Sequence, residues 1–71
     1  MNMRKLGRQL VSIRGAKTRE EAAEGIGISV SALTMYELGR RVPRDDIKIR
    51  IARYYGTSVG KLFFCEEIHE M

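Results

Sequence analysis

The sequence predicts an all-α fold made of five short helices. Three observations support this prediction: apolar residues recur at helical spacing, capping residues and glycines alternate along the chain, and no stretch sustains the alternation of a half-buried strand. A chain of 71 residues suffices for one small domain. We expect this domain to span residues 1–64 and a short C-terminal tail to span residues 65–71.

The first two predicted helices are delimited by glycines and by a capping motif. The first helix carries a single apolar stripe, formed by Met3, Leu6, Leu10 and Ile13. Gly15 ends it, and Thr18 begins the next helix, with Glu21 three residues later at the spacing of a capping box. Gly25 and Gly27 close this second helix within about two turns.

The last three predicted helices are delimited in the same way. Ser29 is placed to cap the third helix, and Gly39 to end it. Pro43 indicates a loop before the fourth helix, because proline disfavours helical backbone in the preceding residue. The expected ranges are residues 29–38, about 45–55 and about 57–64, and the apolar stripe of the fourth helix comprises Ile47, Ile51 and Tyr55.

Positive charge is concentrated in two segments that flank a segment without any. The net charge is +4. Residues 1–19 hold six basic residues and no acid, residues 20–38 hold four acids and no base, and residues 39–61 hold seven bases against two acids. A compact fold can bring these cations to either side of a central element, as a phosphate-binding surface requires. The alternative is ordinary solvated surface charge.

The composition excludes several other classes of protein. The longest apolar runs are far shorter than the ~20 residues that span a bilayer. The first residues lack the apolar stretch of a signal peptide. Cys65 is the single cysteine and cannot form an internal disulfide, so we expect a reducing, cytoplasmic environment.

The stretch from Thr18 to Gly39 carries the strongest functional signal, because it places two short helices on either side of a glycine-containing turn. Such helices meet at a steep angle, so that one can cross the DNA backbone while the other enters the major groove. If Leu33 marks the buried face of the second of these helices, steps of about 100° place an uncharged set on the far side: Ser31, Thr34, Met35 and Leu38. Such a face suits base edges and thymine methyl groups, but it equally suits packing against another helix.

The run from Thr18 to Pro43 resembles the Cro/C1-type (XRE) helix-turn-helix family. The resemblance is carried by three motifs: Gly27-Ile28-Ser29, Tyr36-Glu37-Leu38-Gly39-Arg40-Arg41-Val42-Pro43, and Ser58-Val59-Gly60-Lys61-Leu62-Phe63. It covers about residues 4–64 and implies a five-helix, lambda-repressor-like DNA-binding domain.

The resemblance also implies roles for individual residues, carried over by position. Base edges would be contacted by Val30, Ser31, Thr34 and Met35. Phosphates would be contacted by Arg19, Ser29, Arg40, Arg41 and Arg44. The chain departs from the family pattern at Arg19, where glutamine is common and arginine favours a phosphate contact. It also departs at Ala22, where a core leucine is usual, and at Val30 and Met35, where long polar side chains are common.

No other motif predicts chemistry, and we expect no catalytic site, no cofactor and no metal site. Residues 56–61 approach the spacing of a phosphate-binding loop, but Leu62 stands where serine or threonine is needed. Cys65 and His69 are four residues apart, and two ligands do not make a metal site.

The sequence therefore predicts a transcriptional regulator, most simply a phage-type or bacterial repressor, that binds specific double-stranded DNA. With little beyond this domain in the chain, we expect no separate ligand-sensing domain. We expect a homodimer on DNA, with an interface at Phe63, Phe64, Ile68 and Met71, and Ile49 as a weaker candidate. The alternative is a protein-interaction module of the same fold, such as an antitoxin or anti-regulator.

Overall fold

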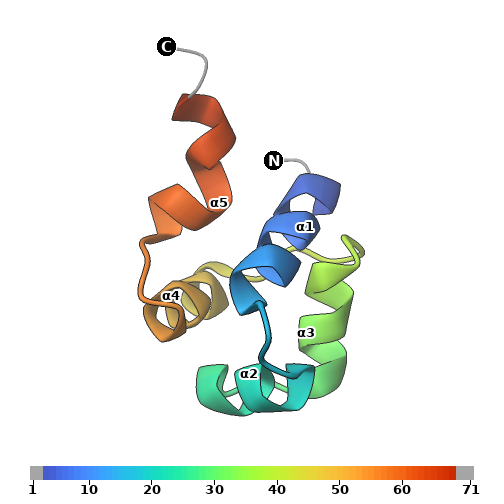
Figure 1. Cartoon of the computed structure of the whole chain (residues 1–71). Coiled ribbons are helices and arrows are strands. Elements are labelled where there is room, and N and C mark those ends of the chain that lie inside the picture. The colour runs from blue at the N-terminus through green and yellow to red at the C-terminus, as the bar shows by residue number, and fades with distance from the viewer. Residues whose placement is uncertain (1–2, 69–71) are drawn as a thin grey trace.

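The computed structural model describes the backbone of residues 3–68 and the side chains of residues 4–63. Its elements are α1 (Met3–Arg14), α2 (Arg19–Ile26), α3 (Val30–Glu37), α4 (Asp45–Tyr54) and α5 (Val59–Ile68). α1 runs through the middle of the molecule, with α3 on one side, α4 and α5 on the other, and α2 across its C-terminal end (Figure 1). The residues described contain no strand, so the predicted all-helical fold is confirmed.

The predicted capping residues place the helices as expected. The hydroxyl of Thr18 accepts a hydrogen bond from the Glu21 amide at 3.1 Å, and a carboxylate oxygen of Glu21 accepts one from the Thr18 amide at 3.1 Å. The hydroxyl of Ser29 accepts a bond from the Ala32 amide at 3.0 Å, which caps α3. Gly25 lies within α2 rather than ending it, because the left-handed residue that stops this helix is Gly27, with φ of 92°.

The last helix is longer than expected. The hydroxyl of Ser58 accepts a hydrogen bond from the Lys61 amide at 3.1 Å, as predicted for a residue that starts a helix. The helix then continues to Ile68, although the sequence predicted an end near Phe64. No glycine or proline follows Gly60, so nothing in residues 61–68 stops the helix. Part of the predicted tail is therefore helical.

One core joins all five helices. Leu10, Leu33 and Ile51 are completely buried at its centre, and Ala22 is buried where the family pattern has leucine. α1 approaches α3 closely at Gly7, since a Cβ atom at this position would collide with the backbone carbonyl of Glu37. This glycine therefore sets the distance between α1 and the helix that carries the candidate reading face.

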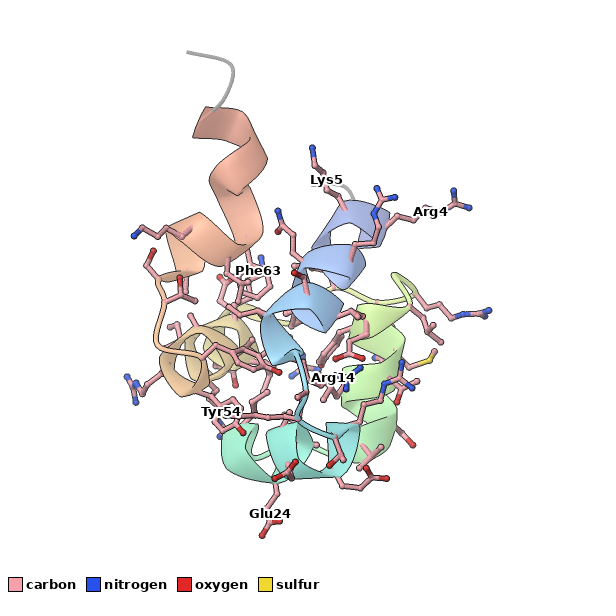
Figure 2. All side chains as sticks on the ribbon, in the orientation of Figure 1. Arg4, Lys5, Arg14, Glu24, Tyr54 and Phe63 are labelled. Carbon is pink, nitrogen blue, oxygen red and sulfur yellow. The ribbon has the colours of Figure 1, made fainter. Side chains whose placement is uncertain are left out.

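Phe63 corrects one sequence prediction. It was a candidate for a dimer interface, yet its side chain is only 4% exposed and belongs to the core of the single chain (Figure 2). Helical periodicity indicates the helix face on which an apolar residue lies. It does not indicate whether that residue is buried in the core of its own domain or against a second copy. The other candidates, Phe64, Ile68 and Met71, have side chains outside the described residues.

Tyr55 carries a buried hydroxyl with no hydrogen-bond partner among the described residues. Burial, and then the negative charge of Glu37, raise the pKa of Tyr55 above its ordinary value. A raised pKa in the folded state means that the folded protein holds this proton more tightly. The corresponding stability is fully present below about pH 10 and is lost as the pH rises through the folded-state pKa.

We expect Tyr55→Phe to raise the free energy of unfolding by about 1 kcal/mol, because it removes an unsatisfied buried group while keeping the ring. It should also lessen the loss of stability above about pH 10. Urea denaturation at pH 7 and at alkaline pH measures both effects. Tyr54→Phe is the matched control, since the Tyr54 hydroxyl lies 3.4 Å from the Lys17 ammonium. A Tyr55→Phe variant less stable than wild type would show that the hydroxyl is bonded after all.

Candidate nucleic-acid interface

The turn between α2 and α3 is fixed by glycine geometry and by a contact from α4. The amides of Gly27 and Ile28 donate to the Ala23 carbonyl at 2.8 and 3.0 Å, which closes the C-terminus of α2. The guanidinium of Arg50, from α4, donates to the Gly27 carbonyl at 3.2 Å. Since residue 27 needs a positive φ, glycine is the natural residue there. The angle between the two helices is therefore set by local backbone and supported by a third helix.

α3 presents its faces as the sequence predicted. Leu33 and Glu37 are buried, while Ser31 and Leu38 are exposed and Thr34 and Met35 are partly exposed. Val30, at the edge of this face, is 38% exposed. Glu37 is the sole charged residue of α3, so its exposed face carries no charge over the full length of the helix.

Glu37 is held between two arginines from two other helices. Its carboxylate accepts from Nε of Arg14 at 2.8 Å and from Nη2 of Arg14 at 3.3 Å. It also accepts from Nε of Arg19 at 2.8 Å. The hydrogen bond to Glu37 raises the pKa of Arg14 above its usual range, against the opposing effect of partial burial. These contacts join α1, α2 and α3 at the end of α1, where Figure 2 labels Arg14.

Two predicted phosphate contacts lie at helix N-termini. Arg19 is the first residue of α2, and its side chain remains 37% exposed although its Nε is bonded to Glu37. Within the described part of the chain, no hydrogen bond uses the Nη groups of Arg19, which are therefore available to another acceptor. Ser29 is exposed, and its hydroxyl oxygen accepts the capping bond, so its proton is free for a phosphate oxygen.

The other three predicted phosphate contacts follow α3. Arg40, Arg41 and Arg44 are all exposed. Arg41 and Arg44 line one hollow of about 330 Å³, together with Tyr36, Val42, Asp46 and Ile47. The structure thus brings Arg41 and Arg44 together at the N-terminal end of α4, next to the last turn of α3. Arg40 lies outside this hollow.

Basic residues that the sequence did not single out form a second cluster, between α4 and the C-terminal part of α2. The Lys17 ammonium lies 4.7 Å from the centre of the Tyr54 ring. Tyr54 in turn lines a hollow of about 250 Å³ with Gly25, Ile26, Arg50 and Arg53. We call Lys17, Arg50, Arg53 and Tyr54 the α4 basic cluster. Lys17 and Tyr54 are 37 positions apart, so local sequence patterns carried no signal for this contact.

Arg4 and Lys5 lie at the start of α1, the end that points away from α2 (Figure 2). Part of the first basic segment therefore lies away from α2, at the end of α1 where Gly7 packs against the C-terminal end of α3. Among the described residues, no three His, Cys, Asp or Glu side chains are grouped as metal ligands. Nor is any helix in that part of the chain both long and apolar enough to cross a membrane.

Two short helices joined by a tight glycine turn, with arginines near the exposed face of the second, form the arrangement of DNA-binding helix-turn-helix domains. A family model described as helix-turn-helix matches residues 14–62, well over half of the chain. The chain therefore belongs to the Cro/C1-type (XRE) helix-turn-helix family, as its sequence motifs indicated. Searches of curated proteins and of solved structures found no match.

Proposed function

We propose that this protein is a transcriptional repressor, cytoplasmic and of bacterial or phage origin, that reads double-stranded DNA with α3 in the major groove. The observation that carries the proposal is the charge arrangement of α3. Its only charged side chain, Glu37, is buried between Arg14 and Arg19, so the whole exposed face is free of the negative charge that would repel DNA. Val30, Ser31, Thr34 and Met35 then face the base edges.

In this proposal, arginines near α3 hold the phosphates. Arg19 and Ser29 lie at the N-termini of α2 and α3, where backbone amides also favour an anion. Arg40, Arg41 and Arg44 lie beyond the other end of α3, with Arg41 and Arg44 sharing a hollow. A duplex lying along α3 therefore meets arginines beside Glu37 at the C-terminal end of the helix, and the helix N-terminus with Ser29 at the other end.

We further propose that two copies bind one operator. A single helix in one major groove reads few base pairs, whereas a two-fold pair with its reading helices ~34 Å apart reads two half-sites. With Phe63 assigned to the core, the proposed interface consists of Phe64, Ile68 and Met71. Ile49, 48% exposed on α4, is an additional apolar candidate.

Titration of labelled duplex over a range of salt concentrations tests the proposal. We expect Arg41→Ala and Arg44→Ala each to weaken binding to preferred and random duplexes by a similar factor, and to reduce the slope of log K against log salt by about one. The matched control is Arg53→Ala, which removes an exposed arginine from the α4 basic cluster. An unchanged slope in the Arg41 and Arg44 variants would contradict the assigned phosphate contacts.

A protein-interaction module is the second candidate function. Leu38 is 54% exposed and Val42 is 39% exposed, and apolar side chains next to the uncharged face of α3 suit a protein partner. The same titration separates the two candidates, because steep salt-dependent binding to duplex is required only of a DNA-binding protein.

A further inference from the structure

We propose that α3 recognises its operator mainly through thymine methyl groups, so that the preferred half-sites are rich in A·T base pairs at the positions α3 faces. This inference rests on the proposed DNA-binding function and names the base chemistry that the same surface reads. It follows from two properties of the exposed face of α3, which presents apolar side chains to base edges and lacks side chains that form paired hydrogen bonds with a base.

The exposed face of α3 has no side chain that forms two hydrogen bonds with one base. Guanine and adenine are read most specifically by paired contacts, from arginine or lysine to guanine and from asparagine or glutamine to adenine. None of these four residue types occurs in α3. The carboxylate of Glu37 has two oxygens that could bond one base, but this side chain is completely buried and is paired with Arg14 and Arg19.

The two hydroxyls on this face add little discrimination. The Thr34 hydroxyl donates its proton to the Val30 carbonyl at 2.8 Å, so it can only accept a bond from a base. Ser31 is exposed, and its hydroxyl can both donate and accept. A single rotating hydroxyl pairs with every base and therefore does not select one.

Apolar groups are what the face offers over its whole length. Val30 lies at the N-terminal end of α3, Leu38 just beyond its C-terminal end, and Met35 between them; Val30 is 38% exposed and Leu38 54% exposed. The C5 methyl of thymine is the apolar group that base pairs present in the major groove. Burying one methyl group against apolar side chains is worth about a fourfold change in Kd.

The neighbouring arginines do not supply the missing selectivity. Nε of Arg19 is bonded to Glu37, which keeps this side chain at the N-terminus of α2. Arg41 and Arg44 line their hollow beyond the far end of α3. Contacts from these positions to phosphates orient the duplex but carry no sequence information. Selection between base pairs is therefore left to the apolar contacts of α3.

The test removes the methyl group and nothing else from the DNA. The tightest-binding duplex is first selected from random sequences, and it is then remade with deoxyuridine in place of every thymidine. With at least two methyl contacts per half-site, we expect the wild-type Kd to rise by about tenfold or more, whereas the Kd of a random duplex should change by less than about twofold. Restoring single methyl groups then maps the contacted positions.

Matched valine variants connect the effect to α3. Val30→Ala should reduce the ratio of the Kd for the deoxyuridine form of the selected duplex to the Kd for its thymidine form, because it shortens an apolar side chain on the reading face. Val11→Ala, at a valine of α1 that is 42% exposed, should leave the ratio unchanged. If the selected duplex binds equally well with and without methyl groups, the inference is wrong while DNA binding stands. If no duplex is bound at all, the proposed function itself is wrong.

Discussion

Glu37→Gln is expected to lower the free energy of unfolding by about 3 kcal/mol, which would leave this small domain with only about 0–2 kcal/mol of stability at 25 °C. The carboxylate compensates two arginines at once, with Nε–oxygen distances of 2.8 Å to both Arg14 and Arg19. Removing one partner of a buried ion pair typically costs about 3–5 kcal/mol, and the partial exposure of both arginines favours the lower end. The total free energy of unfolding of a domain of this size is about 3–5 kcal/mol.

Urea denaturation followed by circular dichroism measures this loss. Glu24→Gln is the matched control, because it makes the same chemical change at an exposed position of α2, where surface substitutions stay within about 0.5 kcal/mol. A Glu37→Gln variant as stable as Glu24→Gln would show that the two arginines do not depend on this carboxylate. The account of how α1, α2 and α3 are held together would then be wrong.

Gly7→Ala is expected to destabilise the domain by about 2–3 kcal/mol, the range for overpacking a tight contact. The added Cβ atom would collide with the Glu37 carbonyl, and it would lie 3.1 Å from the Gly39 amide nitrogen. Both neighbours are backbone atoms, so no side-chain rotation relieves the collision and α1 must move away from α3.

Gly60→Ala provides the opposite expectation in the same chain. A Cβ atom at Gly60 meets nothing within 4 Å, and the residue lies in α5. Alanine in a helix loses less conformational entropy on folding than glycine, so we expect Gly60→Ala to raise the free energy of unfolding by about 0.5 kcal/mol. Thermal and urea denaturation measure whether each variant has a higher or a lower free energy of unfolding than wild type. Equal effects at residues 7 and 60 would contradict the close α1–α3 contact.

Local signals predicted the helix-turn-helix because its boundaries depend on residues near one another in sequence. Thr18 with Glu21, and Ser29 with the amide three residues on, form their bonds within one helical turn. The phase of α3 also followed from its own periodicity, which placed Ser31, Thr34, Met35 and Leu38 opposite the buried Leu33. The buried Glu37 shares the Leu33 face, and its contacts are not local. Its partner Arg14 is 23 positions away, and such a pairing depends on how the helices pack.

The same limit explains the residues whose placement differs from prediction. Arg19 was predicted only as a phosphate contact, yet it also bonds Glu37, because the start of α2 packs against the end of α3. Phe63 was predicted at an interface and lies in the core. In both cases the neighbour across the packing interface, which local sequence patterns do not specify, decided the role.

The most direct test of the central claim, that α3 and the arginines beside it form the DNA-binding surface, is amide chemical-shift mapping of the labelled protein with its selected duplex. We expect the largest shifts at residues 29–35, at the start of α2 around Arg19, and at residues 40–45. Arg53 and Tyr54 of the α4 basic cluster serve as an internal comparison, because they lie at the C-terminal end of α4, in the hollow that Gly25 and Ile26 of α2 also line. Shifts concentrated in that cluster, with α3 unaffected, would contradict the account.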